Sequence, residues 1–208
     1  MSRGFTILTV PRLLPAARHV DHRGWFCEIY SVAAFEDMGI ACCFVQDNHS
    51  FSRHPYTIRG LHFQQPPYAQ DKLVRCLSGR VFDVAVDLRA GSPTYGQWVG
   101  AELSAANGSQ FFIPAGFAHG FLTLEPDCEL SYKVSALYAP QCDGGLRWDD
   151  PAIAIDWPLP TDTAPTLSDK DAGLPALSDF RSPFPYDGTP MPTRGLLRDS
   201  RHDDQGAS

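Results

Sequence analysis

The chain has 208 residues, a length that suits one domain with a full hydrophobic core and room for a terminal extension. Hydrophobic residues make up 43% of it and aromatic residues 12%, so the composition excludes a disordered chain. The formal net charge of −7 argues against a nucleic-acid partner, but an anionic ligand can still bind in a local pocket of arginine and lysine.

Membrane insertion and secretion are not expected from the sequence. No apolar run approaches the ~18–20 residues that a membrane-spanning helix needs, and residues 1–10 lack the apolar core of a signal peptide. The six cysteines show no C-x-x-C pairing, which predicts reduced thiols that mostly fill the core. We therefore expect a cytoplasmic protein with no membrane partner.

The first quarter of the chain predicts short strands and one helix. A strand is expected within 4–14, where apolar residues precede prolines, and an aromatic strand within 21–30 follows a polar turn. The segment Val32–Met38 predicts a short helix, which Gly39 ends in a common way. A further strand begins within 43–50 and ends in a dense polar cluster.

The rest of the chain alternates short apolar runs with Gly, Pro and Asn turns. Strands are expected at 56–64, 72–77, 81–88, 98–103, 110–113, 121–124 and 130–134. This spacing favours an antiparallel sandwich or barrel over βαβ units, so the predicted fold class is all-β with short peripheral helices. We expect one domain at 1–180 and a Pro- and Asp-rich tail at 181–208 that is loosely held and partly disordered.

The strand at 56–64 carries the first chemical signal, the sequence Arg59-Gly60-Leu61-His62-Phe63-Gln64. Strict alternation places His62 and Gln64 on one face and Arg59 on the other. Buried polar groups need partners, since each one left unpaired costs about 1–3 kcal/mol. A core histidine bonded to one backbone carbonyl is the simplest interpretation, and a catalytic base is the alternative.

A second signal lies at 108–119, which has the spacing G-x5-P-x-G-x2-H and ends at His119. This spacing resembles the second sequence motif of the cupin jelly-roll barrels, whose histidine projects into the barrel. Metal-binding cupins carry a His-x-His pair in their first motif, whereas the corresponding place here reads His62-Phe63-Gln64. Two histidines cannot supply the usual three or four ligands, so we predict a barrel without a metal.

A barrel without a metal must do its chemistry with acids and bases. His62 suits the role of base because the ordinary pKa of a histidine is about 6.5. A neighbouring carboxylate would hold its tautomer. Tyr132 and Tyr138 could return a proton as phenols, and Lys72 could stabilise an oxyanion.

Several blocks of sequence then occur in one order. They are Asp21-x-Arg23-Gly24-x-Phe26-x-Glu28, Phe44-Val45-Gln46-Asp47-Asn48-His49-Ser50, Arg59-Gly60-Leu61-His62-Phe63-Gln64, Lys72-Leu73-Val74-Arg75-Cys76, Val81-Phe82-Asp83-Val84-Ala85-Val86-Asp87, Ile113-Pro114-x-Gly116-Phe117-Ala118-His119-Gly120-Phe121 and Arg147-Trp148-Asp149-Asp150-Pro151. From about Phe5 to Asp171 the chain resembles the dTDP-4-dehydrorhamnose 3,5-epimerase family, which are cupin-type sugar-nucleotide epimerases.

The resemblance implies cofactor-independent epimerisation of a nucleotide-linked 4-keto-6-deoxyhexose at C3 and C5, through an enolate. His62 would remove the proton next to the C4 ketone, and Tyr132 would deliver a proton to the opposite face of the sugar. Asp171 would pair with the base, and Lys72 would stabilise the enolate oxygen.

The same resemblance implies a set of substrate contacts and a homodimer. Arg23 and Arg59 would hold the diphosphate of a dTDP-linked sugar, and Phe26 or Tyr138 would offer an aromatic surface to the base. Further contacts are expected from Glu28, Gln46, Asp47, Asn48, His119, Lys170 and Asp143, which stands where the family commonly has a glutamate. The N-terminal strand of the family crosses to the partner subunit, where Arg23 and Glu28 would complete the neighbouring site.

Three other functions remain open at this point: a mono-epimerase acting at C3 or C5 only, a non-catalytic cupin that binds a sugar nucleotide, and a metal-dependent cupin. The set His62, Lys72, Tyr132 and Asp171 argues against a simple binding protein, which has no need of both an acid and a base. Asp83 and Asp87 share one face of their strand, and a solvated face explains them as well as a catalytic role.

Overall fold

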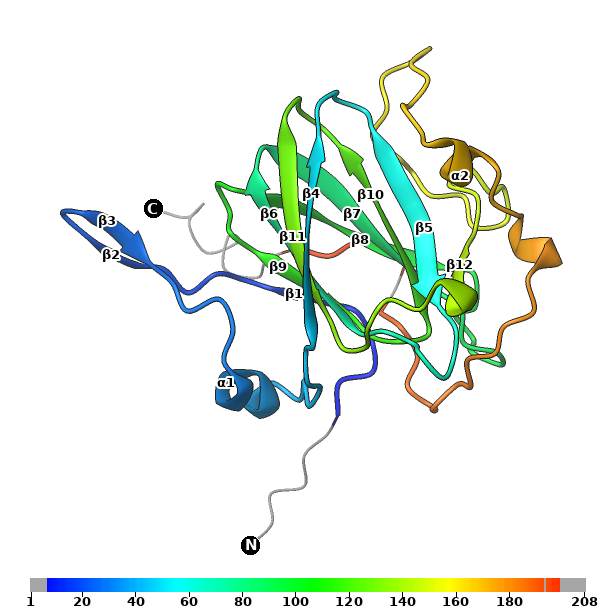
Figure 1. The fold of residues 1–208 in the computed structure, drawn as a ribbon, viewed down its shortest axis with the longest axis horizontal. Helices are drawn as coiled ribbons and strands as arrows, with labels where there is room; N and C mark the ends of the chain where they lie inside the picture. Colours follow the sequence, from blue (N-terminus) through cyan, green and yellow to red (C-terminus); the bar gives the residue numbers. More distant parts are fainter. Residues whose placement is uncertain (1–6, 193, 199–208) are drawn as a thin grey trace, which may run out of the picture.

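Two β-sheets face each other and form an open barrel (Figure 1). The structure is a computed structural model, and it describes residues 7–192 and 194–198. The first sheet has the order β1 (Arg12–Leu14), β9 (Gln110–Ile113), β6 (Lys72–Ser78), β11 (Cys128–Val134) and β4 (Gln46–Ser52). The second has the order β12 (Asp143–Gly145), β5 (Ile58–Gln64), β10 (Phe117–Thr123), β7 (Arg80–Asp87), β8 (Trp98–Ser104) and β13 (Gly195–Leu196). The predicted all-β, cupin-like barrel is confirmed.

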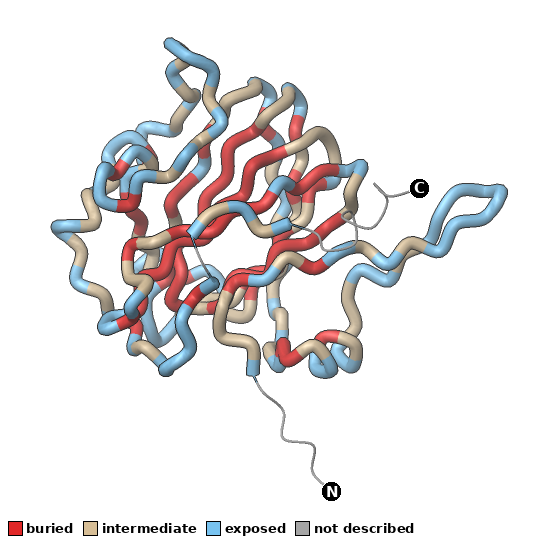
Figure 2. The backbone as a smooth tube through the Cα atoms, turned by 180° about the vertical axis from the view of Figure 1, so that it is seen from behind, coloured by how far each residue is buried: buried red, intermediate tan, exposed pale blue. Residues whose placement is uncertain are grey.

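The remaining elements are small and lie outside the two sheets. They are the hairpin β2 (His19–Asp21) and β3 (Gly24–Phe26), the helices α1 (Val32–Asp37) and α2 (Asp169–Ala172), and two 3-10 turns at Pro140–Cys142 and Leu177–Asp179. The hairpin projects from the barrel as an arm with an exposed surface (Figures 1 and 2). In the described part of the chain no helix is long and apolar enough to cross a membrane.

Strand β7 shows why the second sheet is buried on both faces. Val81 and Ala85 join a cluster that lies between the sheets, whereas Phe82, Val84 and Val86 join another cluster with the segments that follow β12. Those segments contribute aromatic side chains to the cluster on the outer face. A strand buried on both faces becomes a continuous apolar run, and the sequence of β7 has this character.

Helix α1 covers the outer face of the first sheet, as its predicted boundaries allow. The Ser31 hydroxyl accepts a hydrogen bond from the Ala34 backbone N–H at its start, and Gly39 follows its end with φ +85°. Phe35 packs there against Leu73 and other residues of the sheet.

Three strand predictions need correction in their boundaries. The apolar stretch before Pro11 does not form a strand in its described part, and pairing begins only at Arg12, opposite Phe112. Phe5 lies outside the described residues. Strand β4 begins and ends later than expected. Strand β10 begins at Phe117, four residues early, because its N-terminal half pairs with β7 and His119 also pairs with β5.

Part of the predicted tail is attached to the barrel: most of residues 181–192 and 194–198 are exposed, but two apolar side chains among them are buried. Phe184 and Met191 are each only 4% exposed, in the outer and inner clusters respectively. Strand β13 pairs in parallel with the edge strand β8. These few apolar residues pack into the core, although the overall composition of the segment is polar. The end of the predicted tail, 201–208, lies outside the described residues.

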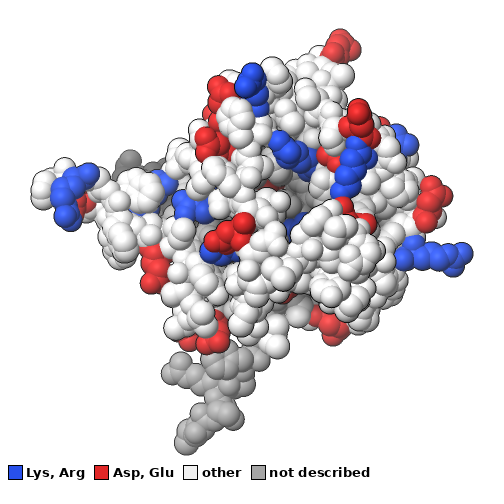
Figure 3. Space-filling model, viewed as in Figure 1, with Lys and Arg blue, Asp and Glu red and all other residues white. Residues whose placement is uncertain are grey.

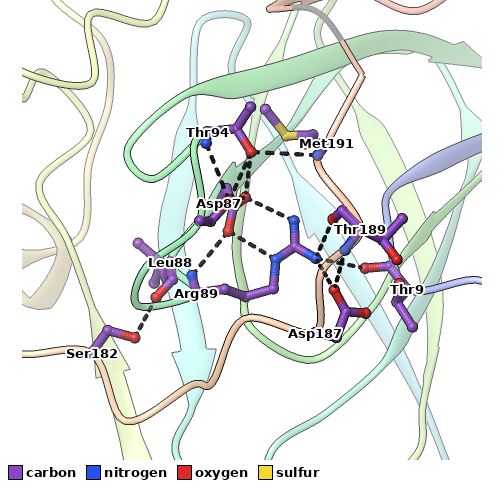
Figure 4. Close-up of polar contacts among 10 residues, drawn as sticks. Thr9, Asp87, Leu88, Arg89, Thr94, Ser182, Asp187, Thr189 and Met191 are labelled. Atoms are coloured by element: carbon purple, nitrogen blue, oxygen red, sulfur yellow. Dashed lines mark hydrogen bonds and ion pairs between the residues drawn. The ribbon is translucent and has the colours of Figure 1, made fainter.

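A buried arginine fastens this segment to the barrel (Figure 4). Arg89 pairs with Asp87 at 2.8 Å and with Asp187 at 3.1 Å, and it donates to the carbonyl of Thr189 at 3.0 Å. Burial opposes ionisation of Asp87, but hydrogen bonds from Arg89, Thr94 and Ser92 outweigh it and lower the pKa of Asp87. Asp87 is fully buried, so of the two interpretations left open for it the solvated face is excluded.

Candidate active site

A cavity of about 670 Å³ opens between the two sheets, next to α2. Figure 3 shows the hollow on this face, with cationic and anionic side chains around its rim. Its walls come from both sheets and from the loops after them. The lining residues include Gln46, Asn48, Arg59, His62, Gln64, Gln70, Lys72, His119, Phe121, Tyr132, Tyr138, Asp143, Ser168, Lys170 and Asp171.

His62 and Asp171 form a hydrogen-bonded pair in the cavity wall. The His62 Nε2 atom lies 2.6 Å from the Asp171 carboxylate. Burial opposes ionisation of Asp171, which is 4% exposed, but hydrogen bonds from His62, Gly60 and Ser168 lower its pKa overall. An ionised Asp171 fixes the proton of His62 on Nε2, so Nδ1 is free to accept a proton.

Helix α2 brings Asp171 to this position. Ser168 begins the helix, and its hydroxyl accepts the backbone N–H of Asp171 at 3.1 Å. The motif Ser168-x-x-Asp171 is a helix start that the sequence contains and that the prediction of elements missed. The backbone N–H of Gly60 also faces the carboxylate, at 3.4 Å.

Lys72 is the buried cation of the cavity. It is 7% exposed, and its Nζ donates to the carbonyl of His62 at 3.3 Å. Burial lowers its pKa to about 8, although Asp83 and Asp143 partly oppose that shift. Its ammonium group is therefore charged at neutral pH but loses its proton at only mildly alkaline pH.

Tyr132 faces the cavity from the first sheet, whereas His62 belongs to the second. Its ring packs on the cluster between the sheets, and burial raises the pKa of its phenol. Tyr132 thus keeps its proton at neutral pH.

A second histidine–carboxylate pair lies in the same wall. His119 is opposite His62 in the register of β10 and β5, and its Nε2 lies 2.9 and 3.1 Å from the two oxygens of Asp83. Asp83 is fully buried on the inner face of β7, so the solvated-face interpretation is excluded for it as well.

Charged and polar groups around the mouth of the cavity are tied to each other. Asp143 accepts hydrogen bonds from Lys170 and, at 3.2 Å, from the Tyr138 hydroxyl. Arg59 donates to the Phe51 carbonyl at 2.8 Å. Gln46 donates to Asn48 at 2.8 Å.

Four residues predicted to contact the substrate lie outside the cavity of the single chain. Arg23 and Phe26 belong to the projecting hairpin, where Arg23 pairs with Asp21. Glu28 follows the hairpin and accepts a hydrogen bond from Ser31. Asp47 points away from the cavity and pairs with Lys133 at 2.8 Å. The other eleven predicted residues all line the cavity.

The position of Arg59 shows that the predicted strict alternation of its strand is wrong. It lines the same cavity as His62, three residues away, although strict alternation would separate them. The pairing of β5 with β10 shifts its register between His119 and Phe121, and this irregularity interrupts the alternation.

No group of three or more His, Cys, Asp or Glu side chains suited to a metal ion occurs among residues 7–192 and 194–198. His62 and His119 each use Nε2 for a carboxylate partner instead. The six cysteines form no disulfide; Cys76 and Cys128 are buried, but Cys43 is exposed, so only part of the set fills the core.

The fold and cavity together define a class of protein: a cupin-type barrel with an open cavity lined by two histidine–carboxylate pairs, a lysine and a tyrosine. Comparison with known proteins makes this specific. The sequence profile of the family described as dTDP-4-dehydrorhamnose 3,5-epimerase matches residues 9–179. The chain belongs to this family of isomerases.

Relatives and solved structures agree with this assignment. A dTDP-4-dehydrorhamnose 3,5-epimerase of Sinorhizobium fredii is 51% identical over 175 residues, which cover 84% of this chain and 89% of the relative. The crystal structure of the Bacillus anthracis enzyme, with TDP and PPi bound, has a TM-score of 0.78 and 46% identity, covering 85% of this chain and 98% of that one. A Legionella pneumophila epimerase in complex with dTDP-4-keto-L-rhamnose has a TM-score of 0.77 and 42% identity, covering 85% and 94%.

Proposed function

We propose that the enzyme converts dTDP-4-dehydro-6-deoxy-D-glucose to dTDP-4-dehydro-L-rhamnose by inverting C3 and C5, with His62 as base and Tyr132 as acid. The observation that carries this proposal is that the two side chains reach one cavity from opposite sheets. Inversion needs groups on both faces of the sugar, since a single group that removes and returns a proton on one face restores the starting configuration.

The proposed reaction begins at His62. Its Nδ1 accepts the proton next to the C4 ketone, and the imidazolium that forms is stabilised by the Asp171 carboxylate at 2.6 Å. The C4 oxygen gains negative charge as the enolate forms, and the Lys72 ammonium neutralises it. Tyr132 then donates its phenolic proton to the carbon from the other face. Proton exchange with the solvent returns His62 to its neutral form and Tyr132 to its phenol, and the second carbon then reacts in the same way. No step requires a cofactor.

The mouth of the cavity fits the nucleotide part of the substrate. Arg59 presents a guanidinium group that can pair with phosphate oxygens, and Lys170 adds a second cation. Tyr138 is 58% exposed beside them and offers an aromatic surface for the base.

The hairpin supports a homodimer in which the N-terminal arm completes the partner's site. Val20, Trp25 and Phe26 on the arm are 78%, 54% and 70% exposed. An isolated two-stranded hairpin is only marginally stable in water. Exposed apolar side chains on such an arm therefore indicate that it packs against the surface of another molecule. Arg23 lies in the arm and Glu28 directly follows it, so in such a dimer both residues would reach the cavity of the partner. A cytoplasmic location remains a prediction.

The reaction in heavy water tests the proposed function. After incubation with dTDP-4-keto-6-deoxyglucose, NMR of the product should show deuterium at both C3 and C5. Deuterium at one carbon would instead identify a mono-epimerase, and none would identify a binding protein without this activity. Metal analysis of the purified active enzyme separates the metal-dependent alternative, which requires a stoichiometric ion.

A further inference from the structure

We propose that Gln64 and Gln70 are positioning residues for nucleotide recognition: their side-chain amides hold the loop that presents Tyr138 at the mouth of the cavity. Residues 136–139 are called the tyrosine loop below. The inference rests on the proposed function in one respect, namely that Tyr138 receives the base of the nucleotide. The hydrogen bonds that hold the loop are independent of that function.

The tyrosine loop has little backbone support. It connects β11 to the 3-10 turn at Pro140–Cys142 and has no regular secondary structure. Among the residues that the structure describes, its one backbone–backbone hydrogen bond runs from the Cys142 N–H to the Ala139 carbonyl, at 2.9 Å. Leu137 and Tyr138 are 60% and 58% exposed, so burial of these side chains does not fix the loop.

Gln64 holds the peptide groups on both sides of Tyr138. Its Nε2 donates to the Leu137 carbonyl at 3.2 Å, and its Oε1 accepts the Ala139 N–H at 2.7 Å. The same Nε2 donates to the Tyr68 carbonyl at 2.8 Å, so both of its N–H groups and its oxygen have partners. Gln64 is only 4% exposed. Loss of its amide would therefore leave backbone groups of the loop without a partner and without ready access to water.

Two further glutamines hold the loop from other directions. Gln70, which precedes β6, donates from Nε2 to the Ala136 carbonyl at 2.7 Å. Gln46, at the start of β4, accepts the N–H of Tyr138 at 3.1 Å. The loop is thus bonded to residues from both sheets, and all three glutamines line the cavity together with Tyr138.

The ring of Tyr138 is also held at its far end. Its hydroxyl donates to Asp143 at 3.2 Å, and Asp143 lies opposite Gln64 in the register of β12 and β5. Strand β5 carries His62 as well. One strand therefore bears both the proposed base and the amide that fixes the aromatic surface. A ring fixed before the ligand arrives binds a base at a lower entropic cost than a mobile ring does.

Amide hydrogen exchange tests the hold on the loop without any ligand. In wild type the Ala139 N–H should exchange slowly, because Gln64 accepts it. Gln64→Met removes the donor and the acceptor but keeps the length of the side chain. We expect the Ala139 amide to exchange at least about tenfold faster in this variant, with the amides of β11 unchanged. Equal exchange in the two proteins would overturn the inference.

Affinity for dTDP, measured by calorimetry, tests the positioning role. Tyr138→Ala should weaken binding by about tenfold, since it removes the aromatic surface. Gln64→Met should weaken binding by about three- to tenfold. In the double variant the affinity should lie within about twofold of Tyr138→Ala alone, because Gln64 acts through the ring. An unchanged affinity in Gln64→Met, or the same loss with and without the ring, would overturn the inference.

Two other variants separate positioning from stability. Gln70→Met removes a single bond to the loop at a partly exposed position, so it should fold and show a smaller loss of affinity. Asp150→Asn alters a buried side chain outside the cavity that holds the N–H groups of Ala152 and Leu177. It should lower Tm but leave dTDP affinity within about 1.5-fold of wild type. A loss of affinity in Asp150→Asn as large as in Gln64→Met would overturn the inference, because stability would then be the cause.

Kinetics keep this inference apart from the proposed function. The KM of Gln64→Met should rise in parallel with its Kd for dTDP, with a smaller change in kcat. A fall in kcat at unchanged KM would overturn the positioning role. Protein that shows the coupling between Gln64 and Tyr138 in dTDP binding but forms no deuterated product would refute the proposed function and leave this inference in place.

Discussion

The pair of His62 and Asp171 gives the sharpest prediction, through the substitution Asp171→Asn. The asparagine side chain has the same shape, but it lacks the charge that makes the carboxylate accept from His62 Nε2 at 2.6 Å. An amide NH₂ turned toward the ring would place the imidazole proton on Nδ1, the nitrogen that must accept the substrate proton. A misplaced base of this kind lowers kcat by about 10²–10⁴-fold.

The assay is exchange of substrate hydrogen with heavy water, which reports proton removal even where inversion fails. Ser168→Ala is the control, because it removes the start of α2 while keeping the carboxylate. It should cost about 1 kcal/mol of stability and change exchange far less than Asp171→Asn does. Exchange in Asp171→Asn within about threefold of wild type would refute the role given to the pair.

The same substitution should change the response to acid. The pKa of Asp171 in the folded enzyme lies below its ordinary value of 3.8. Its ionised form therefore stabilises the fold at pH values above about 4, and this contribution is lost as the pH falls through the lowered pKa. Asp171→Asn should flatten this part of the acid unfolding curve, and an unchanged curve would contradict the inferred ionisation.

Further predictions follow from the lysine, the arm and the C-terminal segment. The kcat of wild type should fall above a pH of about 8 as Lys72 loses its proton, and a flat profile to pH 10 would contradict its role. Phe184→Ala should lower stability by about 3 kcal/mol, or Tm by roughly 6–12 °C, measured by thermal unfolding; no change would mean that the segment is not integral. Mixing inactive His62→Ala and Arg23→Ala protomers should restore about a quarter of wild-type activity if the arm is exchanged, and none if each arm serves its own chain.

Much of the fold could be predicted because local patterns agree with the tertiary structure. The apolar runs of β6, β7 and β8 are interrupted by Gly, Pro and Asn turns close to where the strands end. The helix at Val32 begins and ends at a serine and a glycine that suit those positions. His62 and His119 could also be predicted as site residues, because each belongs to a recognisable sequence motif.

The missed features depend on contacts between distant segments. Alternation alone cannot show the register shift that turns Arg59 into the cavity. The burial of Asp83 depends on His119, which lies 36 residues further along the chain. The packing of the C-terminal segment depends on Arg89, whose partner Asp187 is 98 residues away. Composition alone cannot reveal such a distant partner, so a polar segment is predicted to be a loose tail.

The role of Ser168 as the start of α2 could have been predicted from the sequence. A serine three residues before Asp171 is a common helix start, and it would have placed this aspartate in an ordered turn. The burial of Asp83 could also have been predicted. It shares a strand face with Val81 and Ala85, whose apolar side chains mark the inner face.

In the proposed mechanism an imidazole removes the proton and a phenol returns one from the other face of the sugar. The decisive measurement is deuterium incorporation by His62→Ala, with nucleotide binding measured in the same preparation. The variant should bind dTDP and incorporate no deuterium at C3 or C5. Incorporation at the wild-type rate would show that another group is the base.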